Sequence, residues 1–126
     1  MPLGNAPIMA FVATAKPDGA LHFYRDTLGL ELVEDTPFAL VFTGGGTLLR
    51  IQKGAPPSPP PYTALGWEVG DIGAMAAILA ARGVAFERFP GLEQDERGVW
   101  TAPNGQKVAW FKDPDGHILS LAQLKV

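Results

Sequence analysis

The order of expected secondary structure repeats along the chain, and this repeat constrains the fold more than any other feature of the sequence. Each half reads as a strand, a helix and further strands. Gly29, expected just after the first helix, corresponds to Gly83 after the second. GTLLRI at 46–51 likewise corresponds to GHILSL at 116–121, and the longer spacing of this match fits an insertion at 90–98. We therefore expect two βαβββ modules, neither of which could bury its sheet alone.

The first module begins with an almost wholly apolar run at 7–15, which is typical of a strand covered on both faces. Pro17 and Asp18 suit the first turn of a helix, and Gly29 suits its end. The helix has one core-facing stripe, formed by Leu21, Tyr24 and Leu28. The remaining strands are expected at 30–34, 38–43 and 47–52, the last two joined by a turn at Gly44, Gly45 and Gly46.

The second module is expected to begin with a strand at 62–70, followed by a helix that Asp71 caps and Gly83 ends. One face of this helix is expected to carry Met75, Ile78, Leu79 and Arg82. Asn104 and Gly105 give the strongest short hairpin signal in the chain. The further strands are expected at 84–89, 99–102, 107–111 and 117–124.

A second turn is predicted where Asp113-Pro114-Asp115-Gly116 separates two apolar runs. Proline fixes φ for the second position of a type I turn, aspartate suits the first position and glycine the last. A calcium loop would need further oxygen ligands and a closing glutamate, which this stretch lacks. The stretch therefore predicts a tight turn between two strands.

A proline-rich stretch at 54–61 separates the two modules. Such a stretch can bind SH3-type domains, but its place midway along a small chain favours a stiff connector. With 126 residues, the chain fits a single domain covering 1–126. Module one is expected at about 6–53 and module two at about 62–124.

Composition excludes several kinds of partner and site. The formal charge of −3 gives no basic surface for nucleic acid. The absence of cysteine excludes disulfides, thiol nucleophiles and thiolate metal sites. The start of the chain lacks a signal-peptide pattern, and no apolar run is long enough to span a bilayer. We therefore expect a cytoplasmic protein with no membrane partner.

Two segments together resemble a known family. FYRDTLGLEL at 23–32 and WFKDPDGHILSL at 110–121 are similar to the vicinal oxygen chelate superfamily, which includes glyoxalase I, extradiol dioxygenases, fosfomycin-resistance proteins and bleomycin-binding proteins. AWFKDPDG at 109–116, with LSL at 119–121, resembles a glyoxalase-like subgroup. The resemblance implies an α+β fold in which two βαβββ modules form a cupped mixed sheet around a cavity, often completed in a homodimer. It says less about chemistry, because the superfamily spans several unrelated activities.

The resemblance also implies where the metal-dependent members of the superfamily would hold a divalent ion. The four positions fall on Met9 (Ala10 if the register slips by one), Arg50, Ala64 and Ser120. None of these is a good ligand, and an arginine repels a metal ion. The chain's two histidines, His22 and His117, match none of the positions. We therefore expect no metal and no other cofactor, which disfavours glyoxalase and dioxygenase chemistry.

Strand alternation and the resemblance together give a set of candidate ligand contacts. The candidates are Met9, Arg50, Ala64, Glu68, Trp100, Trp110 and Ser120. Arg50 either forms an ion pair with Glu68 or binds a carboxylate in bidentate fashion, and the sequence leaves both open. Trp100 and Trp110 either pack in the core or form a stacking wall for a flat ligand. Trp67 is expected in the core, and the polar run at 93–97 is either a solvated loop or a lid.

Two classes of function follow. The first is a metal-free protein that binds a small organic molecule, anionic or aromatic, as the drug-sequestering members of the superfamily do. The second is a lyase or dioxygenase-type enzyme that is metal-independent or uses metal ligands that the sequence does not reveal. Ser120 has no histidine expected nearby to act as its base, so the pattern does not support a Ser/His nucleophile. A purely structural partner domain is a third and weaker alternative.

Overall fold

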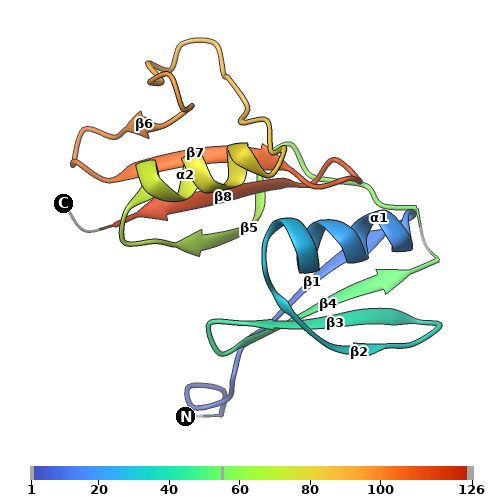
Figure 1. The fold of residues 1–126 in the computed structure, drawn as a ribbon. Coiled ribbons are helices and arrows are strands. Elements are labelled where there is room, and N and C mark those ends of the chain that lie inside the picture. Colours follow the sequence, from blue (N-terminus) through green and yellow to red (C-terminus); the bar gives the residue numbers. More distant parts are fainter. Residues whose placement is uncertain (1, 55, 125–126) are drawn as a thin grey trace. The chain divides into compact units, whose positions relative to one another are not determined.

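The computed structural model describes residues 2–54 and 56–124, arranged in two compact units that meet in sequence between Ser58 and Pro59 (Figure 1). Each unit contains a four-stranded mixed sheet and helical structure, so the fold is α+β as predicted. The boundary between the units falls inside the proline-rich stretch, of which 56–61 forms neither helix nor strand and residue 55 lies outside the described residues. None of the helices in the described part of the chain is long and apolar enough to cross a bilayer.

The two sheets have the same strand order, which confirms the internal repeat. In each sheet, the first and last strands of the module run parallel, and the other neighbours run antiparallel. The first sheet contains, in spatial order, β1 (Met9–Thr14), β4 (Thr47–Lys53), β3 (Ala39–Gly44) and β2 (Glu31–Asp35). The second contains β5 (Thr63–Glu68), β8 (Ile118–Gln123), β7 (Lys107–Lys112) and β6 (Trp100–Thr101).

The first helix begins and ends where the sequence predicts but changes type along its length. A short α-helix, α1 (Pro17–Leu21), continues as a π-helical segment, η1 (His22–Thr27). The wider turn is closed by the Leu28 N–H, which donates to the carbonyl of Phe23 at 2.9 Å. Gly29 then ends the helix with a φ of 80°. Tyr24 is fully buried, as predicted, and its ring lies 5.9 Å from that of Phe42 in β3.

The edge strand β2 contains an irregularity in its pairing with β3. The register shifts between Leu32 and Glu34, so the residue between them has no partner in β3. Glu31, Glu34 and Asp35 are exposed along this strand. β2 is therefore an acidic, bulged edge of the first sheet.

The second helix, α2 (Ile72–Ala81), packs on β7 and β8 (Figure 1). Its cap is as predicted, because the Asp71 side chain accepts a hydrogen bond from the Ala74 N–H at 3.0 Å. The predicted core face was wrong in part. The buried residues are Ile72, Ala76 and Leu79, which lie at i, i+4 and i+7, whereas Ile78 is exposed.

The strand expected at 84–89 does not form in the described structure. This segment runs beside β7, where the Glu87 N–H donates to the carbonyl of Trp110 at 2.8 Å, but no ladder follows. β6 takes the same side of β7 further along, opposite Lys107 and Val108, and covers only Trp100 and Thr101 of the strand expected at 99–102. The apolar side chains at 84–89 are therefore explained by their packing and not by strand pairing.

The turn at Asp113-Pro114-Asp115-Gly116 forms as predicted. The Gly116 N–H donates to the carbonyl of Asp113 at 3.0 Å, and Gly116 has a φ of 90°, which favours glycine. The Asp113 carboxylate is buried and accepts from the N–H groups of Asp115 and His117 at 3.0 and 2.9 Å. Its second oxygen lies 2.8 Å from Nδ1 of His117, which is also buried. Asp113 and His117 therefore serve the turn itself.

Candidate functional site

The face of the second sheet opposite α2 carries the aromatic and polar side chains that form the candidate site. Alternation along β7 sends Phe111 toward α2 and its neighbour Trp110 to the opposite face. Trp110 pairs in register with Ser120 of β8, and Ser120 pairs with Gly66 of β5. This cross-strand row brings residues from three strands onto one face, as the sequence predicts for Trp110 and Ser120.

Beside this row lies a pocket of about 300 Å³, here called the aromatic pocket. Its walls are Pro61, Tyr62, Thr63, Phe89, Leu92, Trp110 and Ile118. Phe89 meets the Trp110 ring edge to face, with centroids 5.3 Å apart and planes at 90°. The Trp100 ring also neighbours Trp110, with centroids 6.1 Å apart and planes tilted by 33°. The three rings form a continuous aromatic surface, part of which lines the pocket.

Ser120 provides a polar group next to this aromatic surface. A Cβ on Gly66 would lie only 2.6 Å from the Ser120 Oγ, so the glycine leaves room for the hydroxyl. Among the described residues, the Ser120 hydroxyl has no hydrogen-bond partner, and every fully enclosed polar side-chain atom does have one. The hydroxyl is therefore in reach of solvent and able to bond a ligand.

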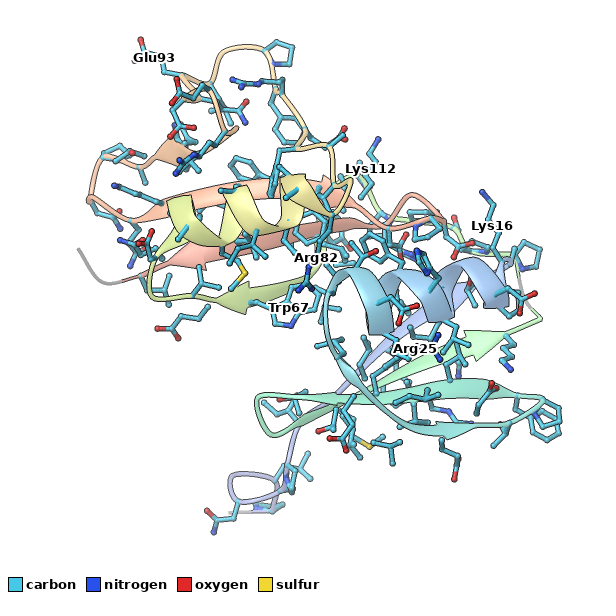
Figure 2. All side chains as sticks on the ribbon, viewed as in Figure 1. Lys16, Arg25, Trp67, Arg82, Glu93 and Lys112 are labelled. Atoms are coloured by element: carbon cyan, nitrogen blue, oxygen red, sulfur yellow. The ribbon has the colours of Figure 1, made fainter. Side chains whose placement is uncertain are left out.

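The lining of the aromatic pocket is electrically neutral. All seven residues that line it are uncharged. Lys112 extends from the end of β7, two residues beyond Trp110 and on the same side of the strand (Figure 2). Its Nζ lies 3.7 Å from Oε1 of Glu87, so a carboxylate of the same unit balances this cation. The pocket thus favours an uncharged, flat molecule over an ion.

Of the five predicted contacts in the second unit, Trp110 lines the pocket, Trp100 and Ser120 neighbour Trp110, and Glu68 and Ala64 are not among the pocket's walls. Glu68 pairs with Ala122 at the far end of β5, and it lines a separate depression of about 310 Å³ with Val69, Gly70 and Gln123. Ala64 falls in a register shift between Thr63 and Leu65, where it pairs with no residue of β8. Trp67 is on the α2 side and stacks on Phe111 at 6.3 Å, as predicted for a core residue.

The other two predicted contacts, Arg50 and Met9, belong to the first unit. Arg50 pairs with Phe11 of β1 and Val41 of β3, so all three share the sheet face opposite α1. Met9 lies two residues before Phe11 and is on the same face. Within residues 2–54 and 56–58, Arg50 makes no hydrogen bond or ion pair. Its pairing with Glu68, which belongs to the other unit, stays a prediction.

The sequence from 7 to 121 matches the family model of the Glyoxalase/Bleomycin resistance protein/Dioxygenase superfamily. The chain belongs to this superfamily. No curated protein matches it.

Solved structures of the superfamily share the fold over nearly the whole chain. A superfamily member from Sphaerobacter thermophilus DSM 20745 is 26% identical, with a TM-score of 0.70 over 93% of this chain and 95% of that one. TnmS3, an antibiotic binding protein from Streptomyces sp. CB03234, is 25% identical, with a TM-score of 0.69 over 96% and 97% of the two chains. A lactoylglutathione lyase from Agrobacterium tumefaciens is 18% identical, with a TM-score of 0.73 over 95% and 94%, and shows the likeness of fold alone.

The residues expected at the superfamily's four metal positions do not fit a divalent ion. Met9, Arg50, Ala64 and Ser120 offer a thioether, a guanidinium, a methyl group and a hydroxyl, whereas Zn, Fe and Mn require converging imidazoles or carboxylates. Among residues 2–54 and 56–124, no three His, Cys, Asp or Glu side chains form a group that could hold a metal ion.

The histidines are engaged elsewhere. His117 is bound to Asp113 in the turn, as described above. His22 lies on η1, where its Nδ1 is 3.0 Å from Oδ2 of Asp26. The Arg25 guanidinium also bonds this carboxylate, at 2.9 Å, and lowers the pKa of Asp26 below its usual range. All three side chains are well exposed, so they form a surface cluster rather than a site.

Sequence reasoning missed most of the pocket's walls. Tyr62, Phe89, Leu92 and Ile118 line the pocket and were not among the predicted contacts. Alternation could have found Ile118, which is two residues before Ser120 on β8. Phe89 and Leu92 belong to the loop at 87–99, and no periodic pattern in the sequence marks them.

Proposed function

We propose that this protein binds a small, flat, largely uncharged organic molecule in the aromatic pocket. The observation that carries the proposal is the pocket itself, in which Tyr62, Phe89 and Trp110 converge on about 300 Å³ of space. This volume is at the lower end of the range of about 300–1,000 Å³ typical of small-molecule sites. It suits one or two fused rings rather than a large drug. The Ser120 hydroxyl, next to Trp110 across the strands, supplies a hydrogen bond to one edge of the ligand.

One of the similar solved structures supports a binding function. TnmS3 shares this fold and is described as an antibiotic binding protein. The enzymatic alternative would need an acid or base at the reacting centre, and among the residues that line the aromatic pocket the phenol of Tyr62 is the sole group of this kind, with no carboxyl or imidazole beside it. Binding is therefore favoured over catalysis at this pocket.

Filling the pocket tests the proposal. The neutral fluorescent probe N-phenylnaphthylamine is expected to bind one molecule per chain, with its emission increased. Ile118→Trp places an indole in the pocket and is expected to weaken the probe's affinity by about tenfold or more. Ile78→Trp is the matched control, because this residue on α2 is 47% exposed and lies outside the pocket. Equal affinity in the two variants would show that the probe binds elsewhere and that the proposed site is wrong.

Arg50, on the first sheet, is a second proposed ligand contact, for anionic molecules that bind the first unit independently of the aromatic pocket. It has no partner among the described residues of its own unit, and it shares its sheet face with the exposed apolar side chains of Met9, Phe11 and Leu48. Anilinonaphthalene sulfonate has the same ring system as the neutral probe and adds a sulfonate. Arg50→Met is expected to weaken binding of the sulfonate about fivefold, because a charge-assisted hydrogen bond is lost.

The neutral probe serves as the control for this prediction. Arg50→Met should change its affinity by less than about twofold, since it carries no charge for the guanidinium to bind. If the variant binds the sulfonate as well as the wild-type protein does, Arg50 is not an anion contact.

A further inference from the structure

Residues 87–99 form an ordered loop whose two limbs are tied together by one side chain, that of Gln94. The Gln94 Nε2 donates to the carbonyl of Glu87 at 2.9 Å and to that of Gly98 at 2.8 Å. Its Oε1 accepts from the Phe89 N–H at 2.9 Å. These three bonds join the incoming limb, at Glu87 and Phe89, to the outgoing limb at Gly98. Gln94 therefore faces into the loop, whereas the sequence placed it in a solvated loop or a lid.

The backbone of Gln94 adds two further ties. Its carbonyl accepts from Nη1 of Arg88 at 3.2 Å, and an isolated bridge pairs Gln94 with Trp100. The neighbouring Glu93 and Asp95 are exposed, and Glu93 extends outward from the loop (Figure 2). Within the polar run at 93–97, the Gln94 side chain thus bonds the backbone of the loop, whereas the charged residues on either side of it are exposed.

The loop supplies one wall of the aromatic pocket. Phe89 and Leu92 line the pocket, and the Phe89 and Trp110 rings are perpendicular, with centroids 5.3 Å apart. Among the described residues, the incoming limb has one backbone hydrogen bond to the sheet, from the Glu87 N–H to the carbonyl of Trp110, and the Glu87–Lys112 ion pair lies at the same residue, so sheet pairing does not extend to Phe89. The bond from Phe89 N–H to Gln94 is the next constraint along the chain.

We infer that Gln94 is a positioning residue, which holds Phe89 and Leu92 against Trp110 and thereby sets the affinity of the aromatic pocket without lining it. The inference rests on the proposed function, in that the affinity concerns the same pocket. Three bonds to backbone groups on both limbs fix the loop in one conformation, so the wall is already formed before the ligand arrives. Preorganisation of this kind strengthens binding because the ligand need not order the loop.

Asp95 provides a matched control within the same loop. Its Oδ1 accepts from the N–H groups of Arg97 and Val99, at 2.9 Å each. Asp95→Ala therefore loosens the outgoing limb and leaves the three Gln94 bonds in place. A variant that merely softens the loop should behave like Asp95→Ala, whereas loss of the positioning residue should also displace Phe89.

The test compares Gln94→Ala and Gln94→Glu with Asp95→Ala in the full chain. Gln94→Glu keeps an acceptor for the Phe89 N–H but places an oxygen where the amide donated to two carbonyls. Both Gln94 variants therefore lose the bonds to the carbonyls of Glu87 and Gly98, and Gln94→Ala also loses the bond from the Phe89 N–H. Affinity for N-phenylnaphthylamine is expected to fall about fivefold in both Gln94 variants and less than about twofold in Asp95→Ala. The indole N–H resonance of Trp110 in the unliganded protein is expected to shift in both Gln94 variants and to stay in place in Asp95→Ala.

Each outcome separates this inference from the proposed function. An unshifted Trp110 resonance in both Gln94 variants overturns the inference, whatever the probe does. Equal losses of affinity in Gln94→Ala and Asp95→Ala also overturn it, since general loosening of the loop would then explain both. If Ile118→Trp leaves probe binding unchanged, the proposed function fails, and the resonance alone decides whether Gln94 positions Phe89.

Discussion

Trp110→Ala is expected to reduce the affinity for N-phenylnaphthylamine about 30-fold. The indole lines the aromatic pocket, and contact with a ligand ring would cover on the order of 80 Å² of it. At about 25 cal/mol per Å², loss of that contact costs about 2 kcal/mol, which corresponds to this change in affinity. A fluorescence titration of the probe against the variant and the wild-type protein measures the effect.

The conservative variant sharpens this prediction. Trp110→Phe keeps a ring against Phe89 and is expected to lose no more than about fivefold in affinity, because much of the stacking surface remains. If alanine and phenylalanine at this position bind the probe equally well, the ring makes no contact with it, and the pocket is not the binding site.

Phe111→Ala is expected to lower the free energy of unfolding by about 4 kcal/mol. Phe111 is 0% exposed and lies between two rings, with Trp67 at 6.3 Å and Phe86 at 5.6 Å. Truncation leaves a cavity that rigid aromatic neighbours cannot close. Urea unfolding followed by circular dichroism measures the change through the shift of the midpoint at constant slope.

An exposed phenylalanine gives the control for this variant. Phe38 is 75% exposed, so Phe38→Ala should change the unfolding free energy by less than about 0.5 kcal/mol. A loss of stability in Phe111→Ala no greater than that in Phe38→Ala would contradict the packing described for the second sheet.

Comparing the variants at Trp110 and Phe111 tests which face of the sheet each side chain occupies, because adjacent residues of β7 face opposite sides. Trp110→Ala should weaken binding far more than it weakens folding. Phe111→Ala should weaken folding and, in the fraction that is folded, leave the affinity for the probe nearly unchanged. The reverse pattern would mean that the two faces of the second sheet have been assigned the wrong way round.

The parts of the fold that the sequence predicted are those set by local chemistry. The turn at Asp113 and the cap at Asp71 depend on groups within four residues of each other, so residue type alone specifies them. The internal repeat was also predicted from the sequence, and the common strand order of the two sheets confirms it. The prediction of a strand at 84–89 was wrong, because the apolar residues of this segment serve packing, with Phe86 against Phe111 and Phe89 against Trp110.

The candidate site was predictable only along the strands. Period-two alternation and the repeat placed Trp110 and Ser120 on one face, which the register of β7 and β8 confirms. Of the remaining walls, Thr63 and Ile118 begin β5 and β8, Pro61 and Tyr62 precede β5, and Phe89 and Leu92 belong to the loop at 87–99, whose course depends on the side-chain bonds of Gln94. A glutamine in a polar run carries no pattern that distinguishes a side chain bonded to the loop backbone from a solvated one. The pairing of Arg50 with Glu68 stays a prediction, since the two residues belong to different units.

The bulge in β2 bears on how this protein behaves in a crowded cell. An exposed sheet edge offers unpaired backbone groups to any other extended chain and can seed aggregation. The register shift between Leu32 and Glu34 breaks the regular spacing of those groups, and Glu31, Glu34 and Asp35 would repel the same strand of a second molecule. Val33, although apolar and 55% exposed, is thus flanked by residues that discourage strand addition. The first sheet can therefore leave β2 at its border and remain resistant to edge-to-edge polymerisation.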